Sequence, residues 1–122
     1  MKKAVIILGT RYTIRQVKMG QDEYMEKLQY GGYCDGCSKE IVLLEYKTIP
    51  EWSKEPNEVI ARQEKETLRH EIIHAFLNES GLGWNSLSVE RAWAKNEEMV
   101  DWIAIQFPKI LKVFIELGCE GE

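Results

Sequence analysis

Two histidines and one glutamate, in the segment His70-Glu71-Ile72-Ile73-His74, are the residues of this sequence best suited to chemistry. The histidines are four residues apart, so on an α-helix both side chains project from one face and can chelate a single zinc ion. Glu71 lies beside them, where its carboxylate could take a proton from a water bound to that zinc. No other histidine occurs in the chain. The spacing therefore predicts a zinc site with Glu71 as general base.

The residues around this motif predict the helix that the site needs. From Asn57 to Ser80 there is no proline or glycine, and Glu, Lys, Arg, Gln and Leu are frequent. These residue types favour helices, and the apolar residues among them recur at helical spacing. Asn57 is the expected N-cap, and Gly81 is the expected stop. The competing interpretation is a solvated helix with two surface histidines.

A catalytic zinc site normally has three protein ligands and an open position for water, so a third ligand must come from elsewhere in the chain. A second helical segment, from about Ser88 to Ile105, contains Glu97, Glu98 and Asp101. Glu97 and Asp101 share one helix face, whereas Glu98 points elsewhere. We expect Glu97 to bind the zinc, with Glu98 as the reserve. Asp101 would then accept the N–H of one ligating histidine, and the sequence leaves open which one.

The HExxH motif and the later Asn-Glu-x-x-x-Asp segment together resemble the gluzincin metallopeptidases, the thermolysin-like clan. They are also similar to compact zincins of the ImmA/IrrE type and to phage-encoded zincins. Residues 68–82 and 96–110 carry this resemblance strongly, and the first 50 residues carry it weakly. Position 77 is Leu and position 80 is Ser, so the glycine and the third histidine of the metzincin pattern are missing.

This resemblance implies a zinc metallopeptidase that hydrolyses peptide bonds, encoded by a phage or a mobile element. Its substrate would be a peptide or a protein, and the compact zincins favour a single regulatory protein. The alternative is a zinc-binding module that binds a partner without cleaving it. Both alternatives require zinc, but only the peptidase requires Glu71 for cleavage.

Composition predicts one domain that spans residues 1–122 and has an ordinary globular balance of 44 % hydrophobic and 30 % charged residues. The net charge of −4 and the lack of a basic block argue against a nucleic-acid partner. No segment has the sequence of a membrane span, and Arg11 interrupts the short apolar start too early for a signal peptide. We therefore expect a cytoplasmic protein, and the oligomeric state stays open.

The order of patterns along the chain predicts an α+β fold. A small N-terminal β-sheet would pack on the HExxH helix and on the following helix with the Glu ligand. The expected strands are Ala4–Leu8, Tyr12–Val17 and Ile41–Tyr46, and a short helix is expected over Asp22–Tyr30. Pro108 is expected to kink or restart the last helix. We expect Ile41–Tyr46 to be the edge strand to which an extended substrate adds.

The segment Cys34-Asp35-Gly36-Cys37 offers a competing metal site. A CxxC pair with His70 and His74 could form a structural Cys2His2 zinc site. However, 32 residues separate Cys37 from His70, far more than in a compact zinc finger, and this site would leave Glu71 unused. Asp-Gly favours a tight turn, so the pair could instead close a hairpin. A redox pair is the third interpretation.

Overall fold

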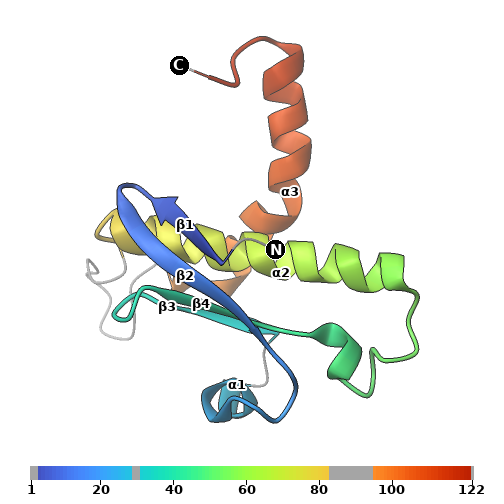
Figure 1. The fold of residues 1–122 in the computed structure, drawn as a ribbon. Coiled ribbons are helices and arrows are strands. Elements are labelled where there is room, and N and C mark those ends of the chain that lie inside the picture. The colour runs from blue at the N-terminus through green and yellow to red at the C-terminus, as the bar shows by residue number, and fades with distance from the viewer. Residues whose placement is uncertain (1–2, 29–30, 83–94, 122) are drawn as a thin grey trace.

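A four-stranded mixed sheet and two long helices form the fold in the computed structural model, which describes residues 3–28, 31–82 and 95–121 (Figure 1). The strands are β1 (Ala4–Ile7), β2 (Thr10–Val17), β3 (Gly32–Asp35) and β4 (Glu40–Leu44), in the sheet order β1-β2-β4-β3. The helices are α1 (Glu23–Leu28), the 3-10 turn η1 (Tyr46–Thr48), α2 (Asn57–Glu79) and α3 (Glu97–Glu116). The expected α+β class is confirmed at this level.

The central position of β4 follows from its continuous apolar sequence. Ile41, Val42, Leu43 and Leu44 are all buried, which is typical of a strand with both faces covered. β4 pairs in parallel with β2 and antiparallel with β3, and the chain between β2 and β4 contains α1 and β3. The prediction that Ile41–Tyr46 is an edge strand was therefore wrong, because β3, which begins at Gly32, pairs with the side of β4 that faces away from β2.

The missed strand β3 forms a hairpin with β4 and contains the first cysteine. Its register pairs Cys34 with Ile41 and Asp35 with Glu40, so residues 36–39 make the turn. The Asp35 side chain accepts hydrogen bonds from the backbone N–H groups of Cys37 (2.9 Å) and Ser38 (3.2 Å), which fixes this turn locally. The hairpin interpretation of the CxxC segment is confirmed.

Helix α2 lies along one face of the sheet (Figure 1) and closes the core. Leu68, Ile72 and Ala75 pack against the strand residues Tyr12 and Ile41. The expected bounds of this helix hold to within one residue. Its cap differs, because Pro56 is the N-cap and Asn57 is the first helical residue. Pro56 fixes the start by its own backbone geometry.

Helix α3 begins later than expected and does not stop at Pro108. It starts at Glu97, while the expected helical residues 88–94 lie outside the described part of the chain. The Asn96 side chain caps the helix by accepting a hydrogen bond from the Met99 N–H at 2.8 Å. Pro108 lies inside a continuous helix, so a restart at Pro108 is wrong.

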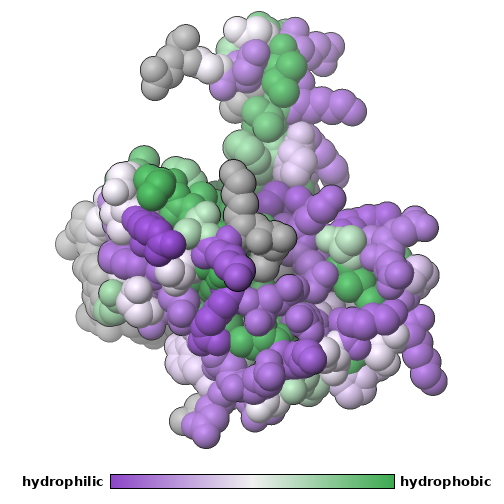
Figure 2. All heavy atoms as spheres, in the orientation of Figure 1, coloured by the Kyte–Doolittle hydropathy of each residue, from purple (hydrophilic) through white to green (hydrophobic). Residues whose placement is uncertain are grey.

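The second half of α3 projects away from the sheet and α2 (Figure 1). Figure 2 shows apolar side chains along this projection, and Val113, Ile115 and Leu117 are exposed there. The first half instead packs on α2 through Val100 and Ala104, which are both fully buried. None of the helices in the three described ranges is long and apolar enough to cross a bilayer.

The Glu79 carboxylate, at the C-terminal end of α2, connects this helix to the sheet through hydrogen bonds. One Glu79 oxygen accepts hydrogen bonds from the Tyr12 hydroxyl (2.6 Å) and from the Lys39 ammonium (2.7 Å). These bonds, with Lys39 the larger contributor, lower the pKa of Glu79 to about 2. Burial, reinforced by Glu79, raises the pKa of Tyr12.

This carboxylate predicts a pH-dependent contribution to stability. Because the pKa of Glu79 is lower in the folded than in the unfolded protein, its contribution is complete above about pH 4.5 and disappears as the pH falls toward 2. We expect Glu79→Gln to be less stable than the wild type at pH 7 in urea unfolding, and the difference to vanish near pH 2. Exposed Glu55 supplies the control, because Glu55→Gln should show no such dependence. A constant difference for Glu79→Gln across this range would contradict the interpretation.

Candidate metal centre

Helix α2 places both histidines and Glu71 side by side at the middle of its length. One ligand atom of each of His70, Glu71 and His74 lies within 4.8 Å of the others. The two imidazole centroids are 4.9 Å apart, as expected for residues one turn apart on a helix face. Glu71 is 4 % exposed and His74 is 8 % exposed, so the group faces the interior. The alternative of a solvated helix with two surface histidines is therefore wrong.

Helix α3 brings two carboxylates against these histidines, although 27 residues separate Glu97 from His70. One Glu97 oxygen is 2.9 Å from His74 Nε2, and the other is 3.1 Å from His70 Nε2. Asp101 Oδ1 is 2.6 Å from His70 Nδ1. Since a carboxylate oxygen only accepts hydrogen bonds, Nδ1 of His70 carries the proton and donates it to Asp101. The histidine that contacts Asp101 is therefore His70, which the sequence left open.

The carboxylates of this group affect one another and the histidines. Burial, followed by the nearby Glu97 and Asp101, raises the pKa of Glu71 to about 8. Burial lowers the pKa of His74, although Glu97 opposes this effect, so the neutral ring is favoured. Within the described residues, Glu71 forms no ion pair with lysine or arginine. Three carboxylates and two imidazoles thus converge on one place, and the Lys95 charge also acts on His74.

These donors fit a zinc ion by type and by spacing. Imidazole nitrogens and a carboxylate oxygen are common zinc ligands, and tetrahedral ligands bonded at about 2.0–2.1 Å lie about 3.3 Å apart. The separations of 2.9 and 3.1 Å between Glu97 and the two Nε2 atoms are close to that value. Without a cation, His70 would need a proton on each ring nitrogen to donate hydrogen bonds to both Glu97 and Asp101. A cation bound by both Nε2 and Glu97 removes this need. The residues present therefore suit zinc.

Arg69 connects the two ligand-bearing helices, and sequence reasoning did not single it out. Its Nε donates a 3.1 Å hydrogen bond to the carbonyl oxygen of Ala104. That carbonyl is the helical partner of residue 108, which is a proline and has no N–H. Arg69 thus supplies the hydrogen bond that Pro108 cannot make. The contact explains why α3 continues through Pro108, and it fixes α3 beside His70.

A double-mutant cycle tests this contact. Arg69→Met should lower the free energy of unfolding by about 1–3 kcal/mol, because the Ala104 carbonyl loses its donor. In a Pro108→Ala background the new N–H of residue 108 bonds to Ala104, so Arg69→Met should cost clearly less. Urea unfolding measures all four proteins. Arg62→Met is the control on an exposed turn of α2 and should cost little. Equal losses in both backgrounds would contradict the proposed contact.

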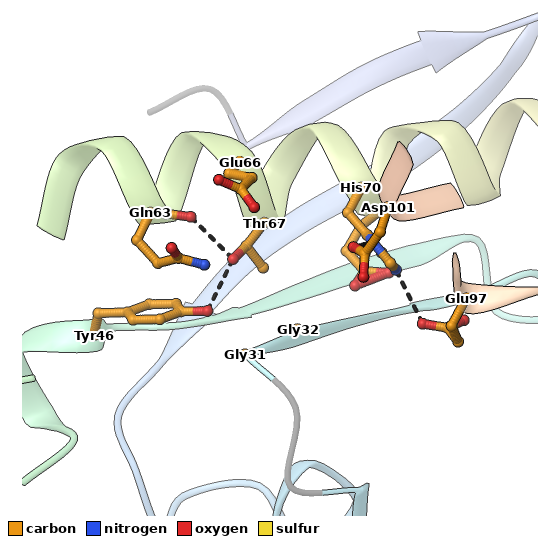
Figure 3. A pocket seen from close by; sticks show the side chains of 10 residues that line it. Gly31, Gly32, Tyr46, Gln63, Glu66, Thr67, His70, Glu97 and Asp101 are labelled. Atoms are coloured by element: carbon orange, nitrogen blue, oxygen red, sulfur yellow. Dashed lines mark hydrogen bonds and ion pairs between the residues drawn. The ribbon is translucent and has the colours of Figure 1, made fainter. Parts of the chain in front are cut away.

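A cavity of about 240 Å³ opens beside the histidines and extends along β3 (Figure 3). Its walls include His70, Glu71, Glu97 and Asp101. The remaining walls come from the upstream turns of α2, from the start of β3 with the residue before it, and from η1, and they are Gly31, Gly32, Tyr46, Gln63, Glu66 and Thr67. The cluster therefore faces an open space that a ligand can enter.

Glycine is required where β3 passes under α2. A Cβ on Gly31 would overlap the Tyr46 hydroxyl, and a Cβ on Gly32 would lie 3.0 Å from the Thr67 methyl group. The Tyr46 hydroxyl shares a 2.9 Å hydrogen bond with Thr67 and reaches into the cavity (Figure 3). Tyr46, from η1, thus places a hydroxyl on the wall of the cavity that His70 and Glu71 also line.

The remaining sequence candidates are not part of this centre, although the charge of Glu71 acts on Cys34. Glu98 is exposed and makes no ion pair within the described residues. Cys34 contacts Asn78, Cys37 is exposed, and neither belongs to the group formed by His70, Glu71 and His74. Burial raises the pKa of Cys34 to about 12, which disfavours the thiolate that a metal or a redox reaction would use.

Comparisons with protein-family models, with curated protein sequences and with solved structures find no match to this chain.

Proposed function

We propose that this protein is a zinc-dependent metallopeptidase with a minimal zincin-like fold. One observation carries the proposal: the Glu97 carboxylate lies between the Nε2 atoms of His70 and His74, with buried Glu71 beside them. Two histidines and one carboxylate are a three-ligand set that leaves a position open, as catalytic zinc sites do. A closed structural site would need a fourth protein ligand instead.

The roles of the residues follow from their positions. His70, His74 and Glu97 would hold the ion, which when bound supplies a Lewis acid for hydrolysis at neutral pH. Glu71 would take a proton from the attacking water and pass it to the leaving amine. Asp101 orients the His70 ring through Nδ1, so that Nε2 faces the ligand position. The Tyr46 hydroxyl would have to leave its hydrogen bond to Thr67, whose own proton goes to the Gln63 carbonyl, in order to donate to the developing oxyanion.

Within the described residues no strand pairs with the outer edge of β3, and this edge supports an extended polypeptide as substrate. Leu44 N–H donates to the Gly31 carbonyl at 2.8 Å, so the alternation of an antiparallel ladder turns the N–H and C=O groups of Gly32 and Cys34 outward. A substrate strand could pair with these groups beside the centre. We propose a peptide or one regulatory protein as substrate. The unpaired thiols Cys34, Cys37 and Cys119 favour the reducing cytoplasm.

Removal and return of the metal test this proposal. The purified protein should contain about one zinc per chain and cleave a panel of unstructured proteins and peptides. A chelator should abolish cleavage, and zinc added in equimolar amount should restore it. Mass spectrometry of the products shows whether the same bonds are cut. Bound zinc without cleavage across the panel would favour the non-catalytic, partner-binding module, and absence of zinc would contradict both.

A further inference from the structure

A second cavity, of about 600 Å³, lies between α1, β4 and the segment after η1. We call it the anchor cavity. Its walls are largely apolar and include Met19, Met25, Leu44, Ile49 and Trp52. Met25 and Leu44 are buried and form a rigid base, whereas Met19 is half exposed. The size is within the range of small-ligand pockets, and methionine suits apolar groups of varied shape.

The anchor cavity shares a wall with the cavity at the metal centre. Gly31, Tyr46 and Gln63 line both. The Tyr46 hydroxyl bonds to Thr67 on the metal side, and its ring meets the Trp52 ring edge-on at 5.1 Å. The Tyr46 side chain thus lies between the two spaces and against Gly31, and an extended substrate could reach from one cavity to the other across this shared wall.

The charged residues around the two cavities narrow the class of ligand that fits them. Glu26 and Glu51 line the anchor cavity and Glu66 lines the metal side, and none of the three forms an ion pair within the described residues. Asp22 differs, because Arg15 and Tyr33 already bond to it. Lys18 is the one cationic residue of this lining. The excess of free carboxylates favours a cationic side chain beside an apolar one.

We propose that the anchor cavity binds a large apolar side chain of the substrate, next to a lysine or arginine, while the cleaved bond lies at the metal centre. This inference rests on the proposed peptidase function and adds its substrate class: polypeptides with an apolar–basic pair at a fixed distance from the cleaved bond. The pair supplies affinity, and the open edge of β3 aligns the backbone between the two cavities.

Binding is tested with the zinc-loaded protein labelled with ¹³C at the methionine methyl groups. The probes are blocked twelve-residue peptides of Gly, Ser and Ala that contain one Phe-Lys pair, with Ala-Lys and Phe-Glu versions as controls. The Phe-Lys peptide should shift the Met19 and Met25 methyl signals, which Met→Leu variants assign. The Ala-Lys peptide should bind roughly 10- to 100-fold more weakly, because one large apolar side chain is no longer buried. The Phe-Glu peptide should also bind more weakly.

A pair of matched variants separates the anchor cavity from nonspecific apolar binding. Met19 and Val113 are each 50 % exposed, but Val113 lies on the projecting part of α3. Met19→Asp should weaken binding of the Phe-Lys peptide at least tenfold, and Val113→Asp should leave it unchanged. Circular dichroism checks that both variants are folded. Trp52→Ala removes a second side chain from the wall of the anchor cavity.

Cleavage of the same peptides distinguishes failure of this inference from failure of the proposed function. Cleavage at one fixed distance from the Phe-Lys pair supports both. Binding that moves the Met19 and Met25 signals without cleavage supports the anchor cavity and contradicts the peptidase. Cleavage that ignores the Phe-Lys pair and survives Met19→Asp overturns the anchor cavity alone. Neither binding nor cleavage of any probe overturns the inference.

Discussion

Glu71→Gln should abolish peptide cleavage while the protein keeps its zinc and its fold. The loss of a positioned general base costs roughly 10²–10⁴-fold in rate, and the amide of glutamine cannot accept the proton of the attacking water. Glu71 is buried and its pKa is raised to about 8, so the metal-free protein already holds a mostly neutral group there at pH 7. A neutral amide of similar size should therefore pack without strain. Rates on one peptide, with zinc content measured on the same samples, give the result.

The activity, zinc content and stability of Glu71→Gln together distinguish a catalytic role of Glu71 from a structural one. Thermal unfolding of Glu71→Gln should match or exceed that of the wild type in the metal-free state. Undiminished cleavage by the variant would mean that Glu71 is not the base, or that a contaminant cleaves the peptide. Loss of zinc together with activity would instead assign Glu71 to metal binding, next to His70 and His74.

Glu97→Ala should lose most of its zinc, whereas Glu98→Ala should keep it. Both residues lie in the first turn of α3, so each substitution removes the same charge from the helix N-terminus. Only Glu97 contacts both imidazoles, and removal of this ligand should weaken zinc binding by more than about 100-fold. Competition with a chromogenic chelator measures the two affinities.

Asp101→Asn, on the same helix, should have an effect on zinc affinity between those of Glu97→Ala and Glu98→Ala. It keeps the shape but weakens the hydrogen bond to His70 Nδ1, and we expect a loss of roughly 10- to 100-fold in zinc affinity. The order Glu97→Ala, Asp101→Asn, Glu98→Ala, from largest to smallest loss, is the expected result. A larger loss in Glu98→Ala than in Glu97→Ala would move the third ligand to Glu98.

The local sequence was sufficient to predict α2, because the residues before, within and after this helix all favour the same bounds. Pro56 precedes it, strong helix formers fill it, and Gly81, with φ of 82°, follows its end. The strands expected at Ala4–Leu8 and Tyr12–Val17 are present as β1 and β2, but the turn at Leu8 and Gly9 was not predicted. Leu8 and Gly9 both have positive φ, as a two-residue type I′ turn requires, although Leu8 is an unusual residue there.

Long-range contacts determine what the sequence did not predict. β3 starts at Gly32, a poor strand former, and exists because it pairs with β4 beneath Thr67. α3 passes through Pro108 because Arg69, 35 residues away from Ala104, supplies the missing donor. The choice of His70 as the partner of Asp101 likewise depends on how α3 crosses α2. Spacing within each helix predicted which residues share a face, and only the packing shows which faces meet.

A crystal structure with anomalous scattering measured at the zinc edge tests the metal centre most directly. The geometry predicts one anomalous peak, bonded to His70 Nε2, His74 Nε2 and a Glu97 oxygen, with one further position open toward the cavity. Glu71 should lie beside that open position without bonding to the metal. A peak at Cys34 and Cys37, a site closed by four protein ligands, or no peak from protein grown with zinc would contradict the account.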